Sequence, residues 1–548
     1  MHARHPLTAA IALLLVFAIP ARAAAAIPEI TVIDINPGEE PSYALDKSTT
    51  GQAVVGNRIF FAADSASGSS QLWVSDGTTA GTHLVKAINP SGDDQVNYIV
   101  PFGDGVMFRA YDVAHQLELW ISDGTESGTH MVKDINAIMD ADAEDGRTFT
   151  SYPQNLYVWN GVLYFAADDG FTGVELWKSD GTESGTVLVK NIADADAHGY
   201  PSDFMALGSR LLFAAQNDTY GSELWSTDGT EAGTQLVKDI NPSGDGYPYG
   251  LVKSGNTVFF MADTGDYGTE LWKSDGTEGG TALVADLTPG SESGYISGNT
   301  LTAFNEGVVF RRVDGGTNGS ELWKSDGTSA GTVIVKDINP GASHAVPAGL
   351  SVMGSYVYFS ANDGTVGTEL WRSDGTAAGT ELVKDIYEGG DSDNGAGPIG
   401  TSGIVSNGVH AYFFAEAPNG DGGTNQEIWR TDGTTAGTVQ IGVAWLHTQD
   451  FCDSCNTPAI FIAGSHVFFR TRTETTMNEL GMFVDDSLPS PDPDGGDETP
   501  PSPDPDGGDE TLPSTNRDGG IGVQLLVLAA GLTAAASLAV RRRERRAN

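Results

Sequence analysis

Cysteine is nearly absent from this chain of 548 residues, which contains only Cys452 and Cys455. A fold held together by many disulfides is therefore excluded. Two lone cysteines in an exported chain usually form a disulfide, and we expect one here that closes a short loop. A redox role would need a thioredoxin-like βαβ context, which the sequence lacks, and a zinc site would need two further ligands nearby.

Basic residues are also scarce. The chain has 29 lysines and arginines against 73 aspartates and glutamates, which gives a net charge of −44. We expect no nucleic-acid partner, because phosphate binding needs a basic surface. An acidic surface suits solubility, cation binding or a salty environment, and its simplest interpretation is a solvated exterior without a specific partner.

The usual signatures of catalysis are missing as well. The sequence has no Gly-x-Ser-x-Gly elbow, no His-Glu-x-x-His pair and no phosphate-binding loop, and its 10 histidines fall at irregular positions. Carboxylates are plentiful, but a glycosidase pair needs a set separation that a sequence does not show. We therefore assign no catalytic and no cofactor-binding residue, and we expect a protein that is not an enzyme.

What the chain has in abundance is one repeated unit, most complete in residues 167–192, ADDGFTGVELWKSDGTESGTVLVKNI. Each copy carries a tryptophan at the same point, and the copies are spaced 47 to 58 residues apart. This period is that of a propeller blade and is longer than most helical or leucine-rich repeats. The tryptophans are Trp73, Trp120, Trp177, Trp225, Trp272, Trp323, Trp371 and Trp429.

Each unit contains two β-rich runs joined by a hairpin loop. The run before the tryptophan is aromatic and β-branched, as in residues 258–261, and a second run such as residues 333–338 follows. The loop between them is Ser/Thr-Asp-Gly-Thr-x-x-Gly-Thr, in which aspartate can accept backbone N–H groups and glycine can adopt a positive φ. We interpret the aspartates as turn formers, since a calcium role would need further oxygen ligands around each. They are Asp76, Asp123, Asp180, Asp228, Asp275, Asp326, Asp374 and Asp432.

The units can be counted from the two ends of the array. Residues 30–38 match residues 237–242 but have no tryptophan motif before them, and residues 467–470 and 479–483 form a degenerate last copy. Nine units of about four strands result, so the sequence predicts an all-β fold in which residues 27–488 form a single β-propeller. Either the ring has nine blades, or it has eight and a terminal unit packs elsewhere.

Residues 175–182, ELWKSDGT, are a full copy of a known repeat, and residues 71–73 and 427–429 are near copies. In this respect residues 30–484 resemble the bacterial ELWxxDGT-repeat surface proteins. The resemblance implies a surface protein and says little about chemistry.

Residues 167–177, ADDGFTGVELW, carry a second resemblance. They are similar to the tryptophan-docking motif A-x-D-x-x-T-G-x-x-x-W of the eight-bladed quinoprotein alcohol dehydrogenases, which implies that Trp177 and its equivalents stack between neighbouring blades. At about 25 cal/mol per Å² buried, each indole would contribute up to roughly 4–6 kcal/mol. The alternative is an exposed aromatic row for sugar stacking.

The dehydrogenase activity does not follow from that resemblance. Those enzymes are marked by a disulfide between adjacent cysteines beside the cofactor, whereas Asp453 and Ser454 separate the two cysteines here. The likeness therefore covers blade packing alone.

The loops that follow the Asp-Ile strand hold most of the variation between units, for example residues 140–145, 241–248 and 388–394. Loops on one face of a propeller are where binding specificity is normally found. If the protein binds a ligand or a calcium ion, we expect the site to lie on these loops. The alternative is that these loops are solvated connectors.

Both ends of the chain carry targeting signals. Residues 1–26 combine a basic start, an apolar stretch and a small-residue site, which predicts a secretory signal peptide. Residues 489–518 are rich in proline, aspartate and glycine and predict a disordered linker. Residues 521–540 carry no charge and precede an arginine-rich tail; as a helix they would rise about 30 Å and cross a bilayer, with the arginines in the cytoplasm.

The last segment, residues 519–548, begins with Gly519 and Gly520 before the apolar stretch and the arginines. This arrangement resembles the GlyGly-CTERM sorting signals of bacterial envelope proteins, which rhomboid-like proteases read. The resemblance implies cleavage near Gly519 and Gly520 by an envelope sorting protease, followed by transfer to the surface or release. A permanent membrane anchor is the alternative.

Together these features predict an exported, non-catalytic repeat protein at a bacterial cell envelope or surface. We expect a binding or adhesion module whose ligand is a surface polysaccharide or a protein. Two alternatives stay open: a hydrolase or lyase that acts on extracellular polysaccharide, and a structural surface protein stiffened by calcium.

Overall fold

A computed structural model describes residues 28–35, 44–45, 51–64, 70–90, 92–138, 149–193, 197–290, 296, 300–314, 318–388, 403–418, 424–446, 460–471 and 479–485. The predicted signal peptide, linker, membrane span and sorting signal lie outside these residues, and so do Cys452 and Cys455. Among the residues described, no helix combines the length and the apolar character needed to cross a membrane.

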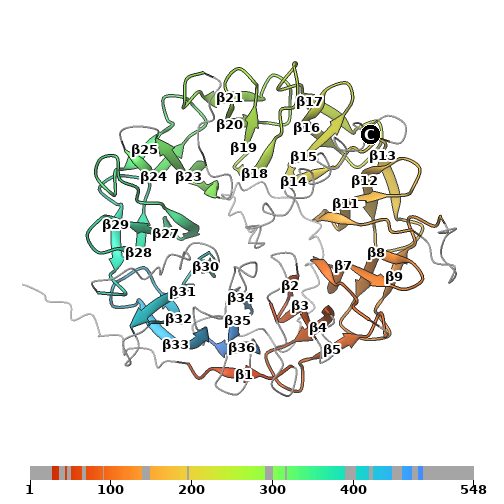
Figure 1. The fold of residues 1–548 in the computed structure, drawn as a ribbon, viewed down its shortest axis with the longest axis horizontal. Coiled ribbons are helices and arrows are strands. Elements are labelled where there is room, and N and C mark those ends of the chain that lie inside the picture. The colour runs from red at the N-terminus through yellow and green to blue at the C-terminus, as the bar shows by residue number, and fades with distance from the viewer. Residues whose placement is uncertain are drawn as a thin grey trace, which may run out of the picture.

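The described residues form nine four-stranded antiparallel sheets, arranged as the blades of a ring (Figure 1). We number the blades 1 to 9 along the chain; in each, the first strand lies nearest the centre and the fourth at the rim. The prediction of an all-β propeller is confirmed, and the ring has nine blades rather than eight.

The strands of blades 1 to 3 are β2 (Gln52–Val55), β3 (Arg58–Asp64), β4 (Ser70–Ser75) and β5 (His83–Lys86); β6 (Asn97–Phe102), β7 (Gly105–Asp112), β8 (Gln116–Ser122) and β9 (His130–Lys133); and β10 (Gln154–Trp159), β11 (Val162–Asp168), β12 (Val174–Ser179) and β13 (Val187–Lys190). Those of blades 4 to 6 are β14 (Ser202–Leu207), β15 (Arg210–Asn217), β16 (Gly221–Thr227) and β17 (Gln235–Lys238); β18 (Tyr249–Ser254), β19 (Thr257–Asp263), β20 (Thr269–Ser274) and β21 (Ala282–Ala285); and β22 (Thr302–Phe304), β23 (Gly307–Asp314), β24 (Gly319–Ser325) and β25 (Val333–Lys336). Those of blades 7 to 9 are β26 (Ala348–Met353), β27 (Tyr356–Asn362), β28 (Thr368–Ser373) and β29 (Glu381–Lys384); β30 (Val405–Ser406), β31 (Ala411–Pro418), β32 (Thr424–Thr431) and β33 (Val439–Leu446); and β34 (Ile460–Ala463), β35 (His466–Thr471), β36 (Glu479–Val484) and β1 (Thr31–Ile33).

The second strand of each blade explains the apolar runs in the sequence. In β19 all five residues from Val258 to Ala262 are buried, whereas in β17, at the rim, buried and accessible residues are mixed. A strand that is covered on both faces carries a continuous apolar run instead of an alternating one. The run before each tryptophan is therefore the middle of a blade, packed between two neighbouring sheets.

Blade 9 is completed by the start of the chain. Strand β1 pairs antiparallel with β36, with Thr31 opposite Met482 and Ile33 opposite Leu480. The backbone N–H of Ile35 also donates to Glu479 Oε2 at 2.9 Å, a contact between residues 444 positions apart. The segment that matches residues 237–242 without a preceding tryptophan motif thus supplies the missing fourth strand of the last copy and closes the ring.

The tryptophans lie on the third strands, at the boundaries between blades. Trp177 on β12 belongs to a buried cluster with Leu119 and Val132 of blade 2 and Phe165 of its own blade. The ammonium of Lys133, from the rim strand of blade 2, lies 5.9 Å from the centre of the Trp177 ring, a cation–π distance. The other seven indoles occupy equivalent clusters.

Burial also decides between the two roles considered for these indoles. Six of them are only 5–7% exposed, and Trp73 and Trp323 are partly buried. They are not available as an exposed row for sugar stacking.

The boundary between blades 8 and 9 differs from the others, because Gly481 of β36 stands where a tryptophan would be. Phe414 of blade 8 packs there against Phe469 and Phe483 of blade 9. A buried polar cluster adds to this contact: the Asp485 carboxylate accepts hydrogen bonds from Tyr412 Oη and from Arg430 Nη1, and His410 Nδ1 lies 3.3 Å from Asp485 Oδ2. One boundary is therefore held by phenylalanines and a buried ion pair in place of an indole.

Replacing one indole tests whether it holds two blades together. Trp225→Ala should lower the free energy of unfolding by about 3–5 kcal/mol, because it leaves a cavity between blades 3 and 4. Urea denaturation followed by circular dichroism measures the change, with the exposed Glu231→Ala on the same blade as control. Equal midpoints for the two variants would contradict the interblade role.

Candidate binding face

The two ends of the blades form two different faces of the ring. On the face that we call upper, the second strand turns into the third and the fourth strand leads to the next blade. Backbone hydrogen bonds join these two kinds of connection. For example, the backbone N–H of Tyr247, in the loop that leads to blade 5, donates to the carbonyl of Ser222, at the start of the third strand of blade 4. On the lower face lie the Asp-Gly loops between third and fourth strands.

The Asp-Gly loops of the lower face are built around the aspartates found in the sequence. In blade 3, Asp180 Oδ1 accepts the backbone N–H of Thr182 at 2.9 Å and its hydroxyl at 2.7 Å. Gly181 has a φ of 91°, and a side chain at Gly185 would collide with the Asp180 carboxylate. The threonine bonds hold the pKa of Asp180 below its usual range. The other seven aspartates make the same bonds.

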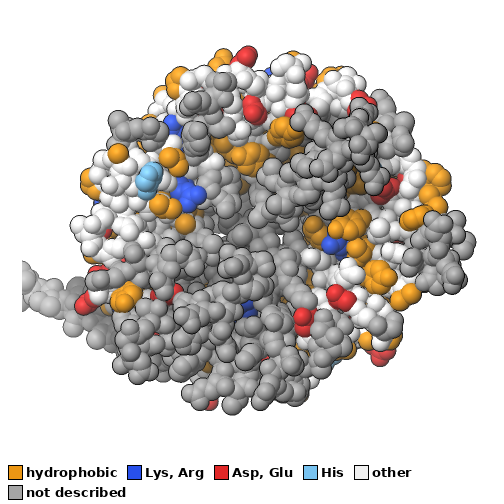
Figure 2. Space-filling view, viewed as in Figure 1, with side chains coloured by type: hydrophobic (Ala, Val, Ile, Leu, Met, Phe, Trp, Pro, Cys, Tyr) orange, Lys and Arg blue, Asp and Glu red, His pale blue; other side chains and the backbone are white. Residues whose placement is uncertain are grey.

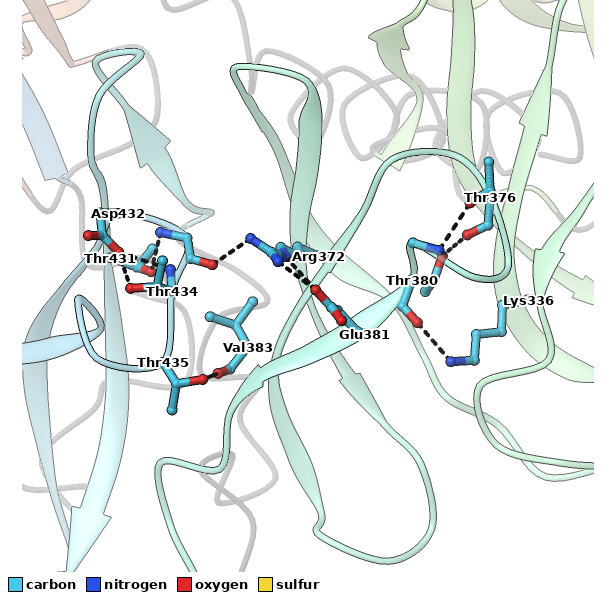
Figure 3. A network of polar contacts seen from close by, with 12 residues as sticks. Lys336, Arg372, Thr376, Thr380, Glu381, Val383, Thr431, Asp432, Thr434 and Thr435 are labelled. Carbon is cyan, nitrogen blue, oxygen red and sulfur yellow. Dashed lines mark hydrogen bonds and ion pairs between the residues drawn. The ribbon is translucent and has the colours of Figure 1, made fainter. Parts of the chain in front are cut away.

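Cations of the preceding blade tie these loops together (Figure 3). Lys336 Nζ donates to the carbonyl of Thr380 at 2.7 Å, and Arg372 Nη1 donates to the carbonyl of Gly433 at 2.7 Å. Lys178 and Lys273 make the corresponding bonds to the next blade elsewhere in the ring. The predicted aspartates of this face thus lie in loops to which the preceding blade is hydrogen-bonded. The described residues contain no group of three or more His, Cys, Asp or Glu that could hold a metal ion.

Below the upper face, every blade except blade 1 has a buried glutamate two residues before its tryptophan position. Glu223 is fully buried, and its carboxylate accepts backbone N–H groups from Ile240 at 2.7 Å, Asn241 at 3.2 Å and Gly246 at 2.9 Å. These donors stand at the beginning and near the end of the loop that leads to blade 5. One carboxylate therefore fixes both ends of an upper-face loop.

The same clamp recurs around the ring. Glu118, Glu175, Glu321, Glu369 and Glu479 bond to the loop that follows their own rim strand. Burial raises the pKa of Glu118 to about 8 and that of Glu175, Glu223 and Glu321 to about 7.

In blade 1, a carboxylate from the loop itself takes the place of the strand glutamate. Gln71 occupies the glutamate position, and Asp94, from the loop itself, accepts the backbone N–H of Ile88 at 3.1 Å and of Asn89 at 2.7 Å. Sequence reasoning missed these carboxylates. The available signal was a glutamate inside an otherwise apolar third strand, a position where a charge is expected only if it is bonded.

Above the clamps, three tyrosines occupy the same position on consecutive blades. Tyr152, Tyr200 and Tyr247 are 48%, 42% and 59% exposed, and their φ angles are 50°, 44° and 43°. Each backbone N–H donates to the start of the third strand of the blade just completed. We call these three residues the tyrosine arc. Gln95 and Val346 hold the equivalent position after blades 1 and 6, also at positive φ.

Neighbouring groups orient the rings of the tyrosine arc. Tyr247 Oη donates to Asp245 Oδ2 at 2.9 Å, and Tyr200 stacks on His198 with ring centres 5.1 Å apart. Arg109 lies 4.6 Å from the Tyr152 ring. Each tyrosine thus has one supported side and a large accessible remainder.

Further exposed aromatic residues lie in the turns between second and third strands on the same face. Phe171 is 73% exposed, Tyr267 43% and Tyr220 39%. Figure 2 shows separate groups of hydrophobic side chains around one face of the ring, with few lysines or arginines between them.

Of the loops singled out in the sequence as binding candidates, residues 241–248 carry Tyr247 and are described in full. Residues 140–145 and 389–394 lie outside the described residues.

No protein-family model matches the chain, and no curated protein matches it. Solved structures show distant likeness. One, from a study of two prolyl endopeptidases, is 10% identical with a TM-score of 0.37 and covers 71% of this chain and 55% of that chain. A puromycin hydrolase is 13% identical with a TM-score of 0.35, over 71% of this chain and 60% of that one. A puromycin-hydrolyzing peptidase from Mycobacterium tuberculosis is 9% identical with a TM-score of 0.34, over 70% and 60%.

This chain therefore spans little more than half the length of the prolyl endopeptidase structure that it matches. At such low identity and similarity, we draw neither an activity nor a substrate from these structures.

The buried carboxylates make stability depend on pH. Because the pKa of Glu223 rises from 4.5 to about 7 on folding, the folded protein retains a proton in this window that the unfolded chain has released. The free energy of unfolding should therefore fall as the pH rises from 5 to about 7. Glu223→Gln, whose side chain has no proton to release, should show a smaller fall in the free energy of unfolding between pH 5 and pH 8 in urea titrations.

The exposed Glu231→Gln, on the same blade, serves as the matched control and should keep the wild-type dependence. If Glu223→Gln and wild type showed the same change with pH, the buried carboxylate would not be the source of the effect.

Proposed function

We propose that this protein is a non-catalytic binding or adhesion module displayed at a bacterial cell envelope, and that its upper face carries the binding site. The observation that supports this proposal is the tyrosine arc: three large, half-exposed rings at one position of consecutive blades, on the face that carries the variable loops.

The backbone at the tyrosine arc strengthens the argument. A positive φ is strained for a residue with a side chain, and glycine would adopt it without that cost. Tyr152, Tyr200 and Tyr247 are nevertheless all in this conformation. Strained positions that the surrounding structure maintains are concentrated at binding sites. Because Gln95 and Val346 share this conformation, the strain belongs to the loop position, and at three consecutive blades that position presents a half-exposed tyrosine ring.

Cellular location enters the proposal through the sequence alone. The signal peptide of residues 1–26, the linker of residues 489–518 and the membrane span of residues 521–540 would place the propeller outside the membrane on a stalk. The resemblances to ELWxxDGT-repeat surface proteins and to GlyGly-CTERM sorting signals support the same location.

Adhesion of cells tests the proposed function. Bacteria that produce the full chain should be retained on immobilised surface polymers or host-cell layers more strongly than bacteria without it, and should leave the polymers intact. Retention is counted after washing, and polymer length is measured by size-exclusion chromatography. Equal retention of the two strains would contradict a binding role, and polymer shortening would contradict a non-catalytic one.

The mass of the mature protein tests the sorting signal. If an envelope protease reads Gly519 and Gly520, the mature chain should end near these residues, and replacing both with leucine should leave the chain uncut. Intact-mass spectrometry of the envelope and medium fractions distinguishes the cleaved chain from the uncut chain. A mature chain that still ends at Asn548 would show that the span is a permanent anchor.

A further inference from the structure

We infer that the ligand of the upper face is a neutral polysaccharide chain, which lies along the tyrosine arc and contacts one ring per blade. The inference rests on the proposed function and names its ligand class. It depends on three properties of the arc: the nature of the exposed groups, the charge around them and their repetition.

The exposed groups suit sugar rings. The face of an aromatic ring carries a partial negative charge, so it attracts the slightly positive C–H groups on the flat side of a pyranose. Hydroxyls at the edge of the sugar need polar partners, and Asp245 lies beside Tyr247 with a carboxylate that accepts more than the two bonds it already makes, to Tyr247 Oη and Ser222 N–H. At Tyr247, an aromatic platform with an adjacent carboxylate meets both requirements.

The charge of the protein argues against other polymers that could stack on the tyrosine rings. Nucleic-acid bases also stack on aromatic rings, but their binding depends on a basic groove, and this chain has a net charge of −44. Arg109, the cation beside Tyr152, is 8% exposed and donates to the carbonyl of Pro153. It offers an anionic polymer little contact. A cationic polymer would be attracted by the whole acidic surface, so its binding would not depend on the arc.

Repetition points to a polymer rather than a folded protein. Protein interfaces centre on a contiguous buried core, whereas Tyr152, Tyr200 and Tyr247 are separated by one blade each. Equivalent platforms at equivalent places match a ligand with repeating units. Each contact can be weak, because linked contacts reinforce one another once the first is made.

Glycine substitutions test this without disturbing the fold. Tyr152→Gly, Tyr200→Gly and Tyr247→Gly remove a ring while keeping, or relieving, the positive φ, so melting temperatures should stay close to wild type. Affinity electrophoresis of the full-length protein in gels containing a neutral glucan, mannan or galactan measures binding. We expect each single variant to bind at least one of these polymers about 3- to 10-fold more weakly, and the triple variant on the order of 100-fold more weakly.

Two positions of the same chain provide matched controls. Gln95→Gly and Val346→Gly make the same backbone change without removing an aromatic ring, and should bind as wild type does. Gln95→Tyr should extend the arc to blade 1 and strengthen binding. Binding should change little between 50 mM and 500 mM salt, because the contacts are not ionic.

The outcomes separate the inference from the proposed function. If displayed protein retains cells but no neutral polymer binds, or the triple variant binds like wild type, the ligand class is wrong and the binding role stands. Tight binding only to polygalacturonate or polylysine, abolished by salt, would likewise overturn the inference in favour of an ionic ligand. If displayed protein retains neither cells nor any polymer, the proposed function itself fails.

Discussion

Each sheet of this propeller has two apolar faces, and it can cover both only by packing against a sheet on either side. The indole on the third strand fills the space toward the preceding blade, where it meets the rim strand and its lysine. An open row of blades would leave an apolar face exposed at each end. The row of blades must therefore close into a ring, and the pairing of β1 with β36 completes the blade that closes it.

The buried carboxylates connect the apolar core to the loops at the surface. A glutamate between apolar neighbours would be costly if unbonded, but here backbone N–H groups of a loop surround it. The loop in turn gains fixed ends, and the tyrosine above it is held at an otherwise unfavourable φ. The exchange of Glu for the Gln71–Asp94 pair in blade 1 shows that the carboxylate can come from the strand or from the loop.

The two faces consequently differ in the side chains that they leave accessible to a ligand. On the lower face, the turn aspartates and the lysines of neighbouring blades bond to backbone and threonine groups within the ring. On the upper face, aromatic rings have one side supported and the other accessible. A rigid ring that presents the same kind of group at successive blades is suited to extended, repetitive ligands, and this is the physical basis of the proposed binding role.

The repeat, the apolar strands, the Asp-Gly turns and the loop that carries Tyr247 were predictable from the sequence, because these depend on residues close together along the chain. Tertiary structure decided what distant residues do to one another. Nine blades rather than eight follow from contacts across 444 positions, and the role of Glu223 depends on loop N–H groups brought back over its strand. The tyrosines form an arc only because successive blades point the same loop to the same face, which no single repeat can show.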